Sequence, residues 1–371
     1  MPPGSPARRL VLVTGAGRSG TSTVTGALHH LGLSVPARVL QPNKSNPRGF
    51  FEPTWSVRFH NRLMERALID KTDTRPEAYG LVAAAVTEQD RAKLRAWMSR
   101  LFDAGAEVVV KDPRSLWITW LWEQVASELG AQIGFLTMIR HPAEVVGSRS
   151  TYYGAGHDDM EAWAFRVANL CAWINGNLGV ERQTRGKTRA VVRYDDLLAD
   201  WRSVILPVAK VFDLGLAASP DDDGPGLVDE FIDPTLRRHE ADWDEMDMPA
   251  ELVELAEGVW GCMGALADSA GNDATAHARM DDLGARYARY MQTAQAVARD
   301  TTIARAHAAR RSTEAEVREE MRGKLRRARR RARAARAEAD RVSNTLGSRI
   351  DRAVRARVPE TVKRALRRRH R

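Results

Sequence analysis

A glycine-rich turn near the amino end of the chain has the composition of an anion-binding loop. Residues 15–22 read Gly-Ala-Gly-Arg-Ser-Gly-Thr-Ser and follow an apolar run at 10–13. Such a turn between a strand and a helix directs backbone N–H groups, and the positive end of the helix dipole, toward one point. The spacing is close to that of a Walker A loop, but Thr21 stands where that loop has its lysine, and the cation is Arg18 inside the turn. The sequence therefore predicts a phosphate or sulfate site whose chemistry differs from ATP hydrolysis.

Cationic and hydroxyl residues also follow two later apolar runs. Lys111 ends the run 107–111, and Arg140 directly follows the run 133–139, with Ser148 eight residues further on. A guanidinium at a strand end and a hydroxyl in the next helix can face the same phosphate, because a guanidinium pairs its N–H groups with phosphate oxygens. The alternative is that Arg140 pairs with a nearby carboxylate such as Glu144 and that Ser148 is an ordinary helix residue. The pattern favours a second anion site, separate from the glycine-rich turn.

Taken together, these segments resemble sulfotransferases that use 3′-phosphoadenosine 5′-phosphosulfate (PAPS). The loop at 17–22 is similar to the family's 5′-phosphosulfate loop, and the Arg140 and Ser148 pair is similar to its 3′-phosphate motif. Residues 111–114, Lys-Asp-Pro-Arg, resemble a segment of many bacterial and carbohydrate sulfotransferases, and residues 193–197 resemble the family's Tyr-Glu-Asp-Leu segment. The resemblance covers roughly residues 8–240. It implies that the donor is bound by Gly17, Arg18, Ser19, Gly20, Thr21, Ser22, Arg140, Ser148 and Tyr194.

The implied reaction moves the sulfuryl group of PAPS to a hydroxyl by in-line displacement without a metal. Cations must then neutralise the charge that grows on the bridging oxygen. Arg18 and the loop N–H groups are the first candidates for this catalytic role, and the resemblance places Lys111 as a second cation near the acceptor. The alternative for Lys111 is a solvated lysine at a strand end. The resemblance to carbohydrate enzymes implies a carbohydrate or glycolipid acceptor.

The acceptor hydroxyl also needs a general base. Glu52 closes a Gly-Phe-Phe-Glu segment of the kind found after the first helix of related sulfotransferases, some of which use a glutamate as base. Aromatic neighbours would raise the pKa of Glu52, which suits a base. The alternative is a glutamate that stabilises the first turn of the next helix. His60, His157 and Asp112 are rivals that the sequence does not separate.

The elements that must position these residues alternate between strands and helices. The apolar runs at 10–14, 107–111, 133–139 and 189–194 read as buried strands, and helical patterns follow at 21–31, 55–69, 89–103, 115–128 and up to about 213. Residues 32–54 read as a loop, 219–226 as an exposed loop and 228–267 as helix. This alternation predicts an α/β fold with a parallel sheet covered by helices on both faces, of the P-loop-like sulfotransferase type. Ligands on such sheets bind beyond the carboxyl ends of the strands, where the motifs lie.

The composition predicts a globular protein in a reducing compartment. The chain has 371 residues, 43% of them hydrophobic, and only two cysteines, Cys171 and Cys262. The amino end lacks the pattern of a signal peptide, and no apolar run has the length of a membrane span. We therefore expect a cytoplasmic protein whose membrane contact, where there is any, is peripheral and at the inner face.

Composition changes sharply near residue 271. We expect a sulfotransferase domain at 1–270, a long helix or coiled coil at 271–345 and a basic amphipathic tail at 346–371. Residues 301–371 hold 24 basic and 8 acidic residues, whereas the whole chain carries a net charge of +9. Such a tail suits an anionic membrane surface, a partner helix or a second copy of the chain, or it is a solvated helix. Nucleic acid is disfavoured because the tail has no interleaved aromatic residues.

Two other functional classes remain open. A P-loop kinase of a small metabolite explains the strand, loop and helix at the start, but the lysine is missing and Asp112 is the nearest candidate for a magnesium-binding carboxylate. A scaffolding or membrane-surface protein would work through the basic tail. A kinase requires magnesium and a sulfotransferase does not, so magnesium dependence distinguishes these two. Deletion of the tail would abolish the function of a scaffolding protein but spare PAPS binding.

Overall fold

The computed structural model describes residues 7–43, 46–154, 156, 158–216, 226–233, 235, 243–244, 246–357 and 359–360. His157, most of the 219–226 loop and the end of the tail lie outside these ranges. The chain divides into two compact units, Met1–Thr293 and Ala294–Arg371.

The first unit is built on a four-stranded parallel sheet. Its strands are β1 (Arg9–Thr14), β2 (Glu107–Lys111), β3 (Gln132–Ile139) and β4 (Arg189–Arg193), in the order β2-β1-β3-β4. The pairs Val13 with Lys111 and Thr14 with Thr137 show that the carboxyl ends of these strands meet at one edge. The predicted parallel α/β sheet is thereby confirmed, with Tyr194 starting a helix rather than ending β4.

Helices surround the sheet. They are α1 (Thr21–His30), α2 (Thr54–Ala67), α3 (Ala78–Ala85), α4 (Glu88–Ala104), the 3-10 helix η1 (Pro113–Trp117), α5 (Thr119–Glu128), α6 (Pro142–Tyr153), α7 (Asp159–Thr184), α8 (Tyr194–Ala199), α9 (Trp201–Val211), α10 (Leu227–Phe231) and α11 (Ala250–Asp268).

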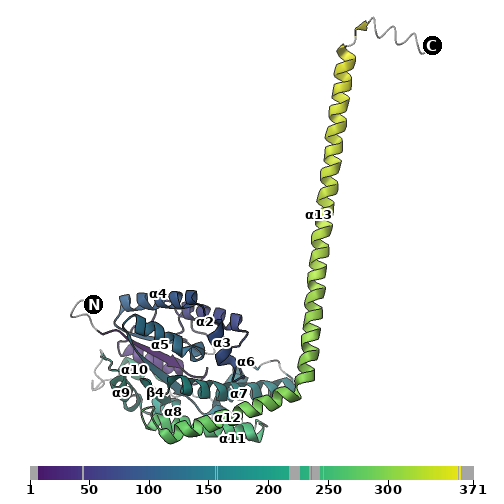
Figure 1. Ribbon diagram of the computed structural model, residues 1–371. Helices are drawn as coiled ribbons and strands as arrows, with labels where there is room; N and C mark the ends of the chain where they lie inside the picture. The colour runs from purple at the N-terminus through teal and green to yellow at the C-terminus, as the bar shows by residue number, and fades with distance from the viewer. Residues whose placement is uncertain are drawn as a thin grey trace. The chain divides into compact units, whose positions relative to one another are not determined.

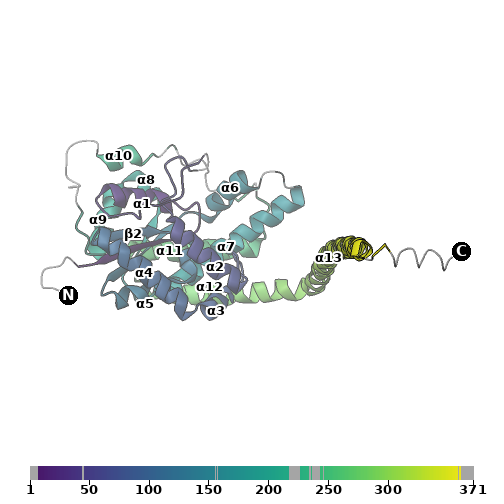
Figure 2. The ribbon, with the colours of Figure 1, turned by 90° about the horizontal axis from the view of Figure 1, so that it is seen from above.

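Side chains of alternate residues along each strand enter cores on opposite faces of the sheet, because successive residues of a strand point in opposite directions. Leu10 and Leu12 pack with α2 to α5, whereas Val11 and Val13 pack with α1, α8 and α9. Figure 1 shows α2, α4 and α5 on one side of the sheet and α8, α9 and α11 on the other, and Figure 2 again shows α4 beside α5.

One helix prediction was wrong. The segment 228–267 is not a single helix: it contains α10 and α11, and its described residues 246–249 are non-helical. Pro249 stands at the amino end of α11, where the missing N–H of proline costs nothing and its fixed φ suits the start of a helix. The short alanine-rich helix α3 was not predicted.

The carboxyl-terminal part of the chain is helical. In α12 (Ala274–Val297), the side chains of Met280, Leu283 and Tyr287 are buried in the core of the first unit, which extends past residue 271 for this reason. In the second unit, α13 (Arg299–Arg357) is one helix of 59 residues without a buried residue. Among the described helices, none combines the length and apolar character that a bilayer crossing requires.

Candidate active site

The glycine-rich turn joins β1 to α1, and two of its glycines are required by geometry. Gly20 has φ 83°, and a Cβ there would lie 2.1 Å from the ring of Tyr194. Gly15 has φ 126°, and a Cβ there would lie 2.4 Å from the carbonyl oxygen of Met138. Both positions combine a left-handed backbone with a close neighbour, so only glycine fits. The turn is therefore held tightly between β3 and the start of α8.

The start of α1 leaves backbone donors of this turn without an acceptor. The N–H groups of Gly20, Thr21 and Ser22 have no hydrogen-bond acceptor within the described residues, as expected for the first turn of a helix. Ser19 differs, because its N–H donates to the carbonyl oxygen of Ala16 at 3.2 Å and its side chain is fully buried. Ser19 thus shapes the loop, while its neighbours present donors at the positive end of α1.

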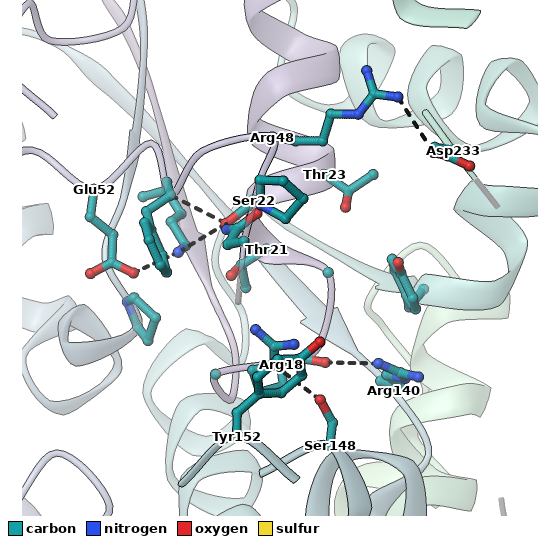
Figure 3. Close-up of a pocket in the computed structure, with 18 of the residues that line it drawn as sticks. Arg18, Thr21, Ser22, Thr23, Arg48, Glu52, Arg140, Ser148, Tyr152 and Asp233 are labelled. Atoms are coloured by element: carbon teal, nitrogen blue, oxygen red, sulfur yellow. Dashed lines mark hydrogen bonds and ion pairs between the residues drawn. The ribbon is translucent and has the colours of Figure 1, made fainter. Parts of the chain in front are cut away.

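A cleft of about 180 Å³ lies over the turn (Figure 3) and collects nearly all of the predicted site residues. These residues come from segments far apart in sequence that all follow the carboxyl ends of parallel strands or flank them. Ser19 is missing from its lining. The predicted residues that line the cleft are Gly17, Arg18, Gly20, Thr21, Ser22, Glu52, Lys111, Arg140, Ser148 and Tyr194.

One end of the cleft is formed by Arg18, Arg140 and Ser148. The Nε of Arg18 donates to Ser148 Oγ at 3.0 Å, and the Arg18 guanidinium lies over the Tyr152 ring at 4.4 Å. The Nη1 of Arg140 donates to the carbonyl oxygen of Arg18 at 3.4 Å, and its Nε donates to Glu144 at 2.6 Å. Arg140 therefore pairs with Glu144, as the alternative expected, and it also faces the turn. Two guanidinium groups and a hydroxyl meet at this end.

Tyr194 links this end of the cleft to the turn. Its ring contacts Gly20, and the guanidinium of Arg140 lies 5.1 Å from the ring centre. Burial raises the pKa of the Tyr194 hydroxyl, so it stays protonated and keeps a donor available.

The other end of the cleft is formed by an ion-pair cluster around Glu52. Its Oε1 lies 2.7 Å from Lys111 Nζ, and its Oε2 lies 3.1 Å from Arg114 Nη1. The same Lys111 Nζ donates to Ser22 Oγ at 3.4 Å, which joins the cluster to the turn. Glu52 is 7% exposed, and its carboxylate is held by these two cations. In Figure 3, Glu52 lies to one side of Thr21 and Ser22, whereas Arg18 lies below them, near Ser148 and Arg140.

Two of the three rival bases, His60 and Asp112, do not line the cleft. His60 and Asp112 are buried and bonded to each other at 2.8 Å, and His60 Nε2 accepts a hydrogen bond from Trp122. Burial by itself would raise the pKa of Asp112, but interactions with His60 and Arg114 lower it well below the usual range. Neither residue lines the cleft, so they support η1 and α2 from behind. His157 lies outside the described residues.

The sequence analysis did not identify several residues that line the cleft. Arg48 lies at its rim, with Nη1 donating to the Glu230 carbonyl oxygen at 3.1 Å and Nη2 3.4 Å from Asp233. Tyr152 lies one helical turn after Ser148, which was a usable signal for it. Arg48 and Asp233 come from segments whose meeting no local pattern encodes.

A smaller cavity adjoins the cleft and shares Gly17 with it. The buried indoles of Trp117 and Trp173 line this cavity together with Lys71 and Arg149. Burial lowers the pKa of both cations, and the pKa of Lys71 is lowered further by the charge of Arg149. The cavity thus combines apolar walls with crowded positive charge. Within the described residues, no group of three or more metal-ligating side chains occurs.

No model of a known protein family matches this chain, and no curated protein sequence matches it. Solved structures that match include the sulfotransferase domain of the Synechococcus PCC 7002 olefin synthase, which is 16% identical and covers 73% of this chain and 98% of its own, with a TM-score of 0.38. The sulfotransferase domain from the curacin biosynthetic pathway is also 16% identical, with 70% and 99% coverage and a TM-score of 0.40. Neither domain is named as a carbohydrate enzyme. Similarity this low carries no functional conclusion, so function has to come from the cleft.

Proposed function

We propose that this protein is a sulfotransferase that moves the sulfuryl group of PAPS to a hydroxyl. The observation that carries the proposal is one cleft with cationic groups at two separate ends: Arg18 with Arg140 and Ser148 at one, and Lys111 with the turn at the other. A nucleotide with a 3′-phosphate and a 5′-phosphosulfate needs two such ends. ATP carries its phosphates in one chain and would leave the Arg140 end unused.

The position of each residue in the cleft indicates which end of the donor it would bind. Arg18 touches Ser148 rather than the Glu52 cluster, so we assign it with Arg140 and Ser148 to the 3′-phosphate. The unpaired N–H groups of the turn and Lys111 Nζ hold the other end, where negative charge grows on the bridging oxygen. The donor supplies the sulfuryl group, which passes to the acceptor oxygen as the bond to the phosphate breaks.

Glu52 is the carboxylate of the cleft best placed to take the acceptor proton. It lies 2.7 Å from Lys111, which lies beside the turn, and the other candidate bases that the structure describes are buried away from the cleft. The two cations that hold it fix its position, as a general base requires.

We place the acceptor at the side of the cleft that adjoins the smaller cavity. Gly17 and Pro113 belong to both, so a bound group can pass from the indoles of Trp117 and Trp173 toward Lys111. Aromatic walls with a few polar groups suit the apolar face of a sugar ring. A carbohydrate or glycolipid hydroxyl is the acceptor class we propose.

A metabolite kinase is the weaker reading. Its magnesium-binding carboxylate would have been Asp112, which is fully buried, bonded to Ser56, His60 and Arg114, and not part of the cleft lining. Kinases hold magnesium through carboxylates that reach the phosphates.

Calorimetry with PAPS and with ATP, each with and without magnesium, tests the proposal. We expect micromolar PAPS binding that is independent of magnesium, at least tenfold tighter than ATP. Arg18→Ala should weaken PAPS binding about tenfold or more, because it removes a charge-assisted contact. Lys210→Ala, which changes an exposed lysine of α9 outside the cleft, is the matched control and should bind normally. Magnesium-dependent preference for ATP would reverse the assignment.

A further inference from the structure

A groove between α2 and α4 lies beside the cleft and shares no lining residue with it. Its volume is about 520 Å³, and it begins at Pro53, which directly follows Glu52 of the cleft. The loop that supplies the candidate base on one side thus forms a wall of this groove on the other. The lining consists of Pro36, Ala37, Arg38, Pro53, Thr54, Trp55, Arg58, Phe59, Arg62, Lys93, Trp97, Arg100 and Leu101.

The groove concentrates positive charge that nothing in the described chain neutralises. Five cations and no acidic residue line it. Elsewhere on the same helices the basic side chains are paired, as Arg66 is with Asp90 and Arg91 with Glu128. No ion pair or side-chain hydrogen bond to another described residue involves the five groove cations, which are Arg38, Arg58, Arg62, Lys93 and Arg100.

The spacing of these five cations brings like charges close together, which lowers the stability of the fold. Arg58 and Arg62 are four residues apart on α2, where like charges oppose helix formation. Lys93 and Arg100 are seven residues apart and therefore share one face of α4. Two facing stripes of like charge reduce stability unless an anion between them offsets the repulsion. An anionic ligand between the two helices would offset this repulsion.

A stack of aromatic rings forms the rigid wall of the groove. The ring centres of Trp55 and Trp97 lie 4.5 Å apart with an interplanar angle of 7°, and those of Trp55 and Phe59 lie 5.0 Å apart at 12°. These rings cover one another's faces and tie α2 to α4. Trp97 and Phe59 are buried, whereas Trp55 stays partly exposed to the groove.

We propose that this groove binds an anionic oligosaccharide. Single-stranded nucleic acid needs open aromatic faces on which bases stack, and here the faces are used within the stack. A membrane surface needs apolar side chains that project from a convex helix, whereas this surface is hollow and lined by guanidinium groups. A thin sugar chain with carboxylates or sulfates fits a hollow surface lined by five cations and no acidic residue. The proposal does not depend on sulfuryl transfer.

Arginine footprinting by mass spectrometry tests it on the full chain, because the basic tail would dominate any bulk binding signal. The probes are a heparin hexasaccharide, the neutral maltohexaose, a dT oligonucleotide of matched charge and phosphatidylglycerol vesicles. We expect the hexasaccharide to protect Arg38, Arg58, Arg62 and Arg100 from phenylglyoxal, and maltohexaose to protect none of them. Protection of tail arginines alone would overturn the proposal. Stronger protection of the groove by the oligonucleotide or the vesicles would overturn the sugar assignment.

A double variant sharpens the test. Arg58→Ala with Arg100→Ala should raise the hexasaccharide concentration that half-protects Arg38 and Arg62 about five- to tenfold, since two exposed charge contacts are lost. Arg95→Ala, on α4 but outside the groove and 3.7 Å from Glu128, is the matched control and should leave it unchanged. Thermal melting checks folding, which both variants should retain because the replaced side chains are exposed. If the half-protecting hexasaccharide concentration is unchanged in the folded double variant, the groove is not the binding site.

Discussion

The assignment of Arg140 to the 3′-phosphate can be tested by removing that phosphate from the ligand and the guanidinium from the protein. Replacement of Arg140 alone would be misleading. Its partner Glu144 is 1% exposed, and a buried carboxylate left without its cation costs about 3–5 kcal/mol of folding stability. The double variant Arg140→Gln with Glu144→Gln removes both charges and keeps a hydrogen bond between the two side chains. It should therefore fold normally.

The expected loss of affinity follows from the contacts of the guanidinium. Its Nε donates to Glu144 and its Nη1 donates to the carbonyl oxygen of Arg18, so the guanidinium faces the turn through its Nη side, where we propose the 3′-phosphate. Hydrogen bonds to a charged group contribute about 1.5–3 kcal/mol each, so one lost contact should weaken binding about 10- to 100-fold. 3′,5′-Diphosphoadenosine should show this loss in calorimetry. Adenosine 5′-phosphate, which lacks the 3′-phosphate, should lose no more than about threefold by the same reasoning.

The comparison of the two nucleotides is decisive because misfolding would weaken both alike. An equal loss for both, or no loss for either in a variant with a normal melting curve, would refute the role of Arg140. Ser148→Ala provides an independent check, since it removes the hydroxyl that accepts from Arg18 at 3.0 Å without removing a charge. The affinity of this variant should fall for 3′,5′-diphosphoadenosine but not for adenosine 5′-phosphate, and by less than in the double variant.

Four further predictions follow from the structure. Glu52→Gln should lower kcat about 10²- to 10⁴-fold in a variant that a melting curve shows to be folded, because it also leaves Lys111 and Arg114 without their carboxylate, and a normal kcat would exclude Glu52 as the base. Gly20→Ala should abolish PAPS binding, because the new Cβ would lie 2.1 Å from the Tyr194 ring; tight binding would show that the turn is not the site. Asp112→Asn should lower the free energy of unfolding by about 3–5 kcal/mol at pH 7. Because the folded-state pKa of Asp112 is lowered, the stability that its carboxylate contributes is present above about pH 4 and is lost as the pH falls below that value. The free energies of unfolding of the two proteins, measured by urea titration, should therefore converge toward pH 2. A difference that stays constant with pH would contradict this. Deletion of residues 301–371 should leave PAPS binding intact and abolish sedimentation with anionic vesicles, and loss of PAPS binding would assign the tail a part in the site.

The strands and the glycine-rich turn between β1 and α1 could be predicted from local pattern alone. Apolar runs of strand length, glycines at forced positions and polar residues at strand ends are short-range signals, and β1, β2 and β3 were located to within a residue. The long-range consequences could not. That Lys111 would lie between Glu52 and Ser22, or that Arg18 would turn toward Ser148, depends on the strand order β2-β1-β3-β4 and on the path of the 32–54 loop.

The sequence by itself determined which residue types stand at the carboxyl ends of the strands, and so which chemistry this protein can offer. The tertiary structure decided which of them meet: it brought Arg140 to the turn, buried His60 and Asp112 behind η1, and set five cations of α2, α4 and a neighbouring loop around one groove. The physical reason is that burial and pairing are properties of three-dimensional neighbours. A charge that looks the same in the sequence becomes a support, a ligand contact or a binding surface according to what packs against it.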